Sequence, residues 1–118
     1  MGIKRSKNHL MRYRPLSSRL YSKNRAHFMQ AMEPGGLAVF NSNDIYPISA
    51  DSTLPFAQHR DIFYLSGIDQ EESILLLFPD ATKPEHKEIL FIKKTSELIA
   101  VWEGQKITQK QATALSGI

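Results

Sequence analysis

Short, uninterrupted apolar runs are the main pattern along this chain after residue 36. There are five, each four or five residues long, rich in Ile, Val, Leu and aromatic residues and bounded by Gly, Pro, Asn, Asp or Lys, which is typical of strands. The runs are Leu37–Phe40, Ile62–Leu65, Ile74–Phe78, Ile89–Ile92 and Leu98–Trp102. Because none of them alternates apolar with polar positions, the pattern predicts strands that are covered on both faces, as in a layered α/β sheet.

An amphipathic helix is predicted ahead of these runs, over residues 17–32. Ser17 or Ser18 can cap its start, and Glu33-Pro34-Gly35-Gly36 ends it, because proline cannot continue a helix and glycine adopts the left-handed cap. Its apolar stripe at helical spacing consists of Tyr21, Phe28 and Met32. The basic residues that we expect to lie off this stripe are Arg19, Lys23 and Arg25.

A second helix is predicted from Thr108 onward, where Thr108 and Gln111 match a capping box. Two helices are too few to cover a five-stranded sheet on both faces, and the second has barely begun at Ile118. We therefore expect a fold that is cut before it is finished. A partner, another domain or a missing tail should cover the remainder of the sheet.

Residues 41–61 contain no periodic segment, although a loop of this length is uncommon inside a compact domain. Its Tyr46 and Phe56 are too apolar for a disordered linker, so we expect an ordered loop with a role at the surface. Asp51 lies in this loop between serines and a threonine, and either forms an Asx turn or faces a ligand with its carboxylate.

The charge is unevenly distributed. Residues 1–32 carry eight basic and no acidic side chains (+8), whereas residues 33–118 carry seven basic and twelve acidic ones (7 − 12 = −5). The eight basic side chains belong to an N-terminal basic arm, residues 1–16, and to the first helix of a domain over residues 17–118. A basic arm suits nucleic acid, an anionic membrane or an acidic protein surface, and an arginine-rich start without acids also fits a mitochondrial transit peptide. We expect a cytoplasmic protein, with mitochondrial targeting as the alternative.

Several classes of site are excluded by composition and motif content. The chain has no cysteine, which rules out a disulfide scaffold, a thiol nucleophile and cysteine-based metal sites. No apolar run approaches the roughly 20 residues of a membrane span, and there is no nucleophile elbow, phosphate loop or dinucleotide fingerprint. The four histidines are scattered along the chain, at His9, His27, His59 and His86. Glu71 and Glu72 are expected to be solvated turn residues.

Four motifs resemble those of one enzyme family. His59-Arg60-Asp61-Ile62-Phe63-Tyr64-Leu65-Ser66-Gly67-Ile68, followed by Glu71-Glu72-Ser73-Ile74-Leu75-Leu76-Leu77, resembles the "D-F-x-Y-L-T-G-F…E-x-A-x-L-L-L" core of the amino-terminal domain of Xaa-Pro aminopeptidase (aminopeptidase P), in the creatinase and prolidase-like "pita-bread" group. The other three matches are Met32-Glu33-Pro34-Gly35-Gly36, Asp51-Ser52-Thr53-Leu54-Pro55-Phe56 and Val101-Trp102-Glu103-Gly104-Gln105-Lys106. Together they cover about residues 28–106, in the family's order and spacing.

The resemblance implies a fold and a function. The fold would be α/β with three layers, a ribonuclease H-like mixed β-sheet with flanking helices, here truncated at the C-terminus. The whole enzyme would hydrolyse the bond between an N-terminal residue and proline, using two Mn²⁺ ions held by a C-terminal catalytic domain that this chain does not contain. The chain itself would hold no catalytic residue, no metal and no cofactor. It would support homo-oligomerisation and control access to the active site.

The same resemblance implies which residues serve that access. Trp102 and the loop around Asp51 would reach the cleft of a neighbouring subunit. Arg60 enters this set because Ala57-Gln58-His59-Arg60 replaces the family's "R-Q-D/N-S", which moves one arginine three places along the loop. From the residues alone, Trp102 is either a core side chain or an interface anchor at a strand end.

Two other interpretations stay open. A creatinase-type enzyme or an Xaa-Pro dipeptidase would share this domain but act on other substrates, although Trp102-Glu103-Gly104 favours the aminopeptidase. A nucleic-acid-binding module would use the basic arm, but it lacks the aromatic interleaving that suits base stacking. The expected partners are therefore the protein's own catalytic domain, neighbouring subunits and a peptide with proline in second position, with neither nucleic acid nor membrane.

Overall fold

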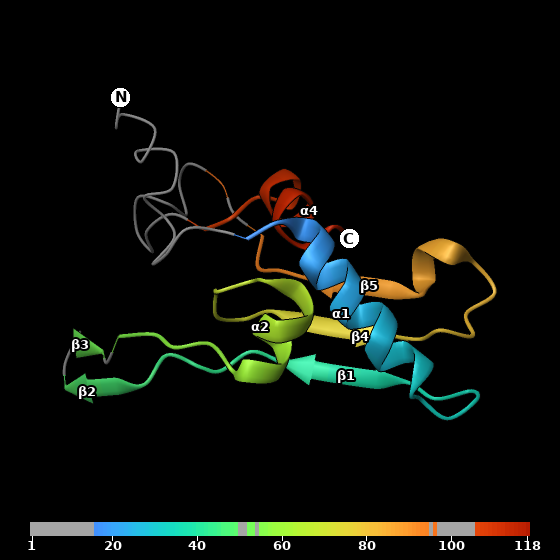
Figure 1. Cartoon of the computed structure of the whole chain (residues 1–118). Coiled ribbons are helices and arrows are strands. Elements are labelled where there is room, and N and C mark those ends of the chain that lie inside the picture. The colour runs from blue at the N-terminus through green and yellow to red at the C-terminus, as the bar shows by residue number, and fades with distance from the viewer. Residues whose placement is uncertain (1–15, 50–51, 54, 95, 97–105) are drawn as a thin grey trace.

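The computed structural model of this protein describes residues 16–49, 52–53, 55–94, 96 and 106–118 (Figure 1). Along the chain, the described elements are α1 (Ser18–Gln30), β1 (Ala38–Asn41), β2 (Pro47–Ser49), β3 (Ser52–Thr53), α2 (Arg60–Ser66), β4 (Ile74–Leu77), the 3₁₀ helix η2 (Pro84–His86), β5 (Glu88–Phe91) and α4 (Gln109–Ser116). The basic arm, residues 1–16, lies outside this part of the chain except for the exposed Leu16, and so does the predicted strand Leu98–Trp102.

Three of the predicted strands form an antiparallel sheet in the order β1-β4-β5. Val39 on β1 pairs with Leu76 on β4, which pairs with Ile89 on β5. Helices α1, α2 and α4 pack on one face of this sheet, so the predicted α/β class is confirmed. Every strand pair among the described residues is antiparallel.

The two predicted helices form where their caps place them. Ser17 begins α1 by accepting a hydrogen bond from the backbone N–H of Arg19, at 3.2 Å. The capping box at α4 is complete, since Thr108 Oγ1 accepts from the N–H of Gln111 while Gln111 Oε1 accepts from the N–H of Thr108. Helix α1 ends at Gln30, and the left-handed glycine, Gly35, lies in the turn beyond that end.

The predicted strand Ile62–Leu65 is wrong, because these residues belong to helix α2. His59 Nδ1 caps the helix by accepting from the N–H of Asp61, and Gly67 ends it in the left-handed conformation with a φ of 72°. Ile62 and Leu65 are buried, whereas Tyr64 between them is exposed, as on a one-sided helix. A four-residue apolar run cannot distinguish helix from strand by its period, and here the flanking caps decide.

Residues 41–61 are also more structured than the sequence predicts. Strands β2 and β3 pair antiparallel and form a small hairpin at the far end of a long excursion from the sheet (Figure 1). We call residues 43–58 the arm, which is distinct from the basic arm at residues 1–16. Tyr46 and Ile48 are exposed on it.

The core lies between the helices and one face of the sheet. Leu75 and Leu77 on β4 are fully buried against Ile62 and Leu65 of α2. Phe28 of α1 and Phe40 of β1 stack edge to face beside this cluster, with ring centroids 5.3 Å apart. A second cluster joins α4 to the turn after α2; its buried members are Ile68, Ile107 and Ala112. Within the described part of the chain, no helix has the length and apolar character of a membrane span.

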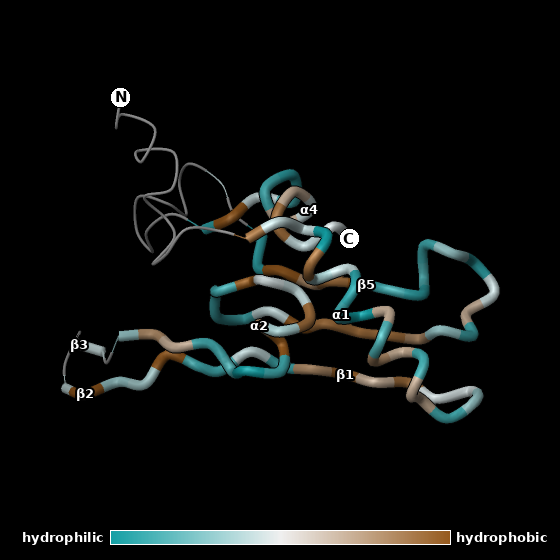
Figure 2. Tube along the Cα trace, in the orientation of Figure 1, coloured by the Kyte–Doolittle hydropathy of each residue, from teal (hydrophilic) through white to brown (hydrophobic). Residues whose placement is uncertain are grey.

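The opposite face of the sheet is apolar but exposed. Val39 is 53% exposed, Ile74 39% and Phe91 52%, although the strands are among the most hydrophobic parts of the chain (Figure 2). Leu76 and Ile89 complete this surface, which we call the open face, because they pair with Val39 in one row across the three strands. The described helices thus cover one side of the sheet, as their small number predicts.

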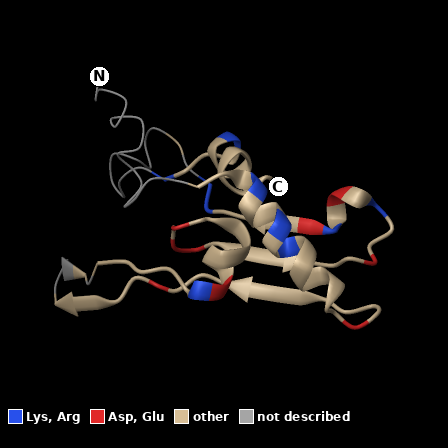
Figure 3. Cartoon of the chain, in the orientation of Figure 1, with Lys and Arg blue, Asp and Glu red and all other residues tan. Residues whose placement is uncertain are grey.

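Arg25 corrects another expectation from the sequence. It was expected off the apolar stripe of α1, yet its side chain is fully buried. Nε donates to Oε1 of Glu88 at 3.0 Å, one terminal nitrogen donates to the carbonyl of Leu65 at 2.9 Å, and the other donates to Ser22. Basic residues are spread along helix α1, and the acidic start of β5 lies beside that helix (Figure 3). Arg25 therefore joins α1, α2 and β5 from inside the domain.

Candidate functional site

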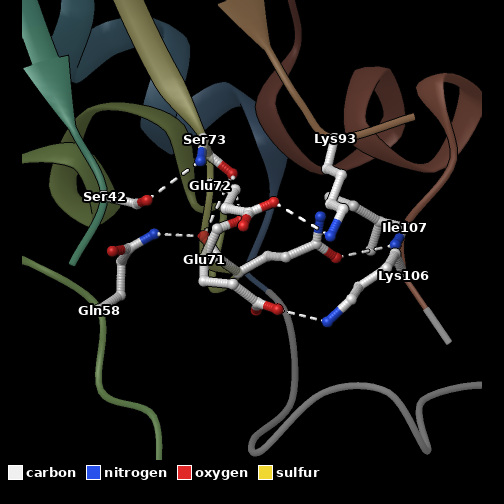
Figure 4. A network of polar contacts seen from close by, with 9 residues as sticks. Ser42, Gln58, Glu71, Glu72, Ser73, Lys93, Lys106 and Ile107 are labelled. Carbon is white, nitrogen blue, oxygen red and sulfur yellow. Dashed lines mark hydrogen bonds and ion pairs between the residues drawn. The ribbon is translucent and has the colours of Figure 1, made fainter. Parts of the chain in front are cut away.

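The turn between α2 and β4 is the centre of a polar network, with Ser42 and Gln58 on one side and Lys93 and Lys106 on the other (Figure 4). The turn begins at Gly67, where a Cβ would lie only 2.5 Å from the Tyr21 ring, so the close packing of α1 on this corner requires glycine. It then runs through Gln70, Glu71 and Glu72 to Ser73, which precedes β4.

Both carboxylates of this turn form ion pairs with lysines. Glu72 Oε2 lies 3.2 Å from Nζ of Lys93, just beyond β5. Glu71 pairs with Lys106, which precedes α4, and this contact is largely shielded from water, with 14% and 13% of the two side chains exposed. The expectation that these acids are solvated is therefore wrong for Glu71. Sequence alone could not show this, since Lys106 follows Glu71 by 35 residues.

Gln70 adds a third connection on the same side. Its Oε1 accepts a hydrogen bond from the backbone N–H of Ile107 at 2.9 Å, and both residues are buried. No described residue accepts from Nε2 of Gln70. The turn therefore binds Lys106 and Ile107 through adjacent side chains.

Gln58 connects the arm to the opposite side of the turn. Its Nε2 donates to the carbonyls of Ile68 and Gln70, both at 3.0 Å, while its Oε1 accepts from the N–H of Asn43 at 3.1 Å. Asn43 Nδ2 in turn donates to the carbonyl of Ala57 at 3.0 Å. These bonds hold the two ends of the arm together and against the turn.

Ser42 and Ser73 complete the attachment of the arm. The N–H of Ser42 donates to the carbonyl of Ser73 at 2.9 Å, and the N–H of Ser73 donates to Oγ of Ser42 at 3.0 Å. The pair continues the β1-β4 ladder by one step beyond Asn41 and Ile74. The arm therefore leaves the sheet from a fixed position.

The predicted access residues relate differently to this network. Arg60 is exposed at the first position of α2 and is not a member of it. Asp51 and Trp102 lie outside the described residues. In the sequence, however, Asp51 falls between the two ends of the arm, and Trp102 falls between Lys93 and Lys106. The network thus holds the ends of both segments that carry these residues.

The described residues do not form a metal centre or a site for proton transfer. No three His, Asp or Glu side chains within them converge to hold a metal ion, so they do not fit the two manganese ions that the whole enzyme would use. Two hollows border α4, of about 370 and 520 Å³, and the larger contains Lys93, Lys94 and Lys110. Among the described residues, neither is lined by a histidine, aspartate or glutamate side chain that could move a proton.

Comparison with known proteins identifies the family. A family model described as "Aminopeptidase P, N-terminal domain" matches residues 21–118. The chain belongs to the aminopeptidase P N-terminal domain family. The resemblance seen in the four sequence motifs is thereby confirmed.

Relatives of this domain are Xaa-Pro aminopeptidases. The Xaa-Pro aminopeptidase of Escherichia coli is 25% identical over 103 residues, which are 87% of this chain and 23% of the relative. The human Xaa-Pro aminopeptidase 3 is 34% identical over 79 residues, 65% of this chain and 16% of the relative. The chain therefore spans less than a quarter of the length of either relative.

Solved aminopeptidase P structures share the fold. A zinc-substituted E. coli aminopeptidase P in complex with product superposes with a TM-score of 0.75 at 24% identity, over 89% of this chain and 24% of that one. The Pseudomonas aeruginosa aminopeptidase PepP gives 0.77 at 23% identity, over 87% and 23%. The aminopeptidase P N-terminal fold is thus confirmed for nearly the whole chain.

Proposed function

We propose that this chain is the non-catalytic N-terminal domain of a manganese-dependent Xaa-Pro aminopeptidase, and that it supports oligomerisation and access to the active site. The observation that carries the proposal is the family match over residues 21–118, together with relatives about four times as long. A domain that forms a quarter of an enzyme, and whose described residues hold no metal-binding cluster, is suited to positioning.

The polar network supports the role in access. It fixes the ends of the arm through Gln58 and the ends of the segment 93–106 through Glu71 and Glu72. Asp51 and Trp102 belong to those two segments. We assign them, with Arg60, to contacts with a neighbouring subunit's cleft, where they would limit which peptides reach the reacting bond.

The open face supports packing against the rest of the enzyme. Exposed apolar surface spread over three adjacent strands is typical of an interface. The partners we assign are the protein's own catalytic domain and neighbouring subunits, and the substrate is a peptide with proline in second position. The two manganese ions, bound in the catalytic domain, would supply an activated water and stabilise developing negative charge.

Peptidase assays of two proteins test the proposal. The 118-residue chain with added Mn²⁺ should release no amino acid from an Xaa-Pro peptide, whereas the full-length protein should do so and lose this activity with a chelator. In the full-length protein, Trp102→Ala should change the preference for peptide length and leave the metal content unchanged. Manganese-dependent hydrolysis by the 118-residue chain alone would contradict the proposal.

A further inference from the structure

The segment between β5 and α4 is bound at both of its ends by neighbouring residues of one turn. Lys93, two residues after the end of β5, pairs with Glu72, and Lys106, three residues before the start of α4, pairs with Glu71. Figure 4 shows both lysines directed at the same turn. Because Glu71 and Glu72 are consecutive, Lys93 and Lys106, the two ends of the segment, are held close to each other.

The two ion pairs differ in their environment. Glu71 and Lys106 are shielded from water, and the adjacent hydrogen bond from Ile107 to Gln70 is fully inside the domain. Removing one charge from such a pair leaves the other buried without compensation, so this end is bound firmly. The pair of Glu72 with Lys93 is more exposed, with 56% and 33% of the side chains accessible, and is therefore weaker.

Glu72 has a backbone conformation that is unfavourable for glutamate. Its φ is 57°, and it is the only described non-glycine residue with a positive φ. Glycine or asparagine adopts this conformation more easily than glutamate does. The turn thus carries a conformationally unfavourable residue at the position that contacts Lys93.

We propose that Glu71 and Glu72 are positioning residues, which bind Lys106 and Lys93 and thereby fix where the two ends of the segment 93–106 lie. Together with Gln70, they hold both ends of the segment on one turn. The expected effect on catalysis rests on the proposed function, because that proposal gives Trp102 its role in access to the active site. The effect on the segment itself does not depend on it.

Trp102 is the chain's single tryptophan, so its fluorescence reports on this segment alone. In the 118-residue chain, Glu71→Gln and Glu72→Gln should each change the acrylamide quenching constant of Trp102 by about twofold and shift its anisotropy, while the far-UV circular dichroism stays the same. The matched control is Glu85→Gln, which removes the same charge from the exposed 3₁₀ helix η2 and should leave Trp102 unaffected.

Further variants separate binding of the lysines from a local effect in the turn. Glu72→Asn relieves the backbone but cannot reach Lys93, so it should alter Trp102 as Glu72→Gln does. Glu71→Asp keeps the charge and should change Trp102 less than Glu71→Gln. If Glu71→Gln does not fold, Glu72→Gln and Glu71→Asp carry the test. Unchanged quenching and anisotropy in the folded variants would overturn the inference.

A kinetic measurement distinguishes this inference from the proposed function. In the full-length enzyme, Glu71→Gln should raise KM for an Xaa-Pro peptide about threefold and leave kcat nearly unchanged, because the effect is on positioning. A changed Trp102 signal with unchanged KM would uphold the two positioning residues and contradict the access role. An unchanged Trp102 signal would overturn the positioning role whatever the kinetics.

Discussion

Arg25 and Glu88 connect the first helix to the last described strand through a hydrogen bond of 3.0 Å. The two residues lie 63 positions apart, and the guanidinium is fully buried while the carboxylate is partly exposed. The same guanidinium donates to the backbone carbonyl of Leu65, in the last turn of α2. One side chain therefore sets the relative position of two helices and a strand.

Replacing Arg25 should accordingly be costly. Arg25→Met keeps much of the volume but leaves the Leu65 carbonyl and Glu88 without their donor, and should lower the free energy of unfolding by about 3 kcal/mol. Urea unfolding measures this. The control Arg19→Met, at an exposed position of the same helix, should cost less than about 0.5 kcal/mol. Equal effects at the two positions would contradict the burial of Arg25.

Gly67 and Gly35 provide a matched pair of substitutions. Both have positive φ, at 72° and 75°, but a Cβ would meet the Tyr21 ring only at Gly67, and nothing within 4 Å at Gly35. Gly35→Ala should cost about 1 kcal/mol through backbone strain alone. Gly67→Ala should cost about 1–3 kcal/mol more, because α1 must move. Thermal unfolding would show equal losses if Tyr21 did not pack there.

The effect on stability of a substitution in the open face should differ between the 118-residue chain and the full-length protein. In the 118-residue chain, Phe91→Ser should change stability by less than about 1 kcal/mol, because the ring is half exposed. It should also reduce the binding of a hydrophobic dye. In the full-length protein the same change should cost about 3 kcal/mol, if the face is covered as proposed. A small cost in both proteins would argue against a covered face.

Tyr21 makes stability depend on alkaline pH. Burial raises the pKa of its hydroxyl above the ordinary value of 10.0. The unfolded chain therefore ionises at lower pH than the folded one, and stability is lost as the pH rises above about 10. Tyr21→Phe should remove this part of the loss. Urea titrations of both proteins at pH 8 and 10.5 measure the difference, and parallel losses would contradict it.

Local signals allowed much of this fold to be predicted. Ser17 and the Thr108–Gln111 box mark where two helices begin, because caps act over two or three residues. The run Ile62–Leu65 does not reveal its helix, since the period of so short a run is ambiguous and His59 is a less conspicuous cap than serine or threonine. Arg25 lies four residues after Tyr21, on the buried stripe, but its charge counts against burial, so the sequence does not predict its place.

The polar network was less predictable than the elements. The lysine partners of Glu71 and Glu72 follow them at sequence distances that carry no periodic signal. The same holds for Gln70 and Ile107, which meet only because α4 packs beside the turn. Such pairings follow from tertiary packing, so the family motifs indicated the important residues without indicating their contacts.

The open face also bears on how a protein of this family is made. An N-terminal domain leaves the ribosome before the parts that follow it, and domains generally fold as units during synthesis. If the open face is covered as proposed, the domain presents, until that cover is complete, an apolar sheet surface together with two strands, β1 and β5, that are outermost among the described strands. Such surfaces pair readily with other chains. Aggregation therefore competes most strongly with correct assembly between the folding of this domain and the completion of the protein. In that period a holding chaperone also has the largest apolar surface to bind.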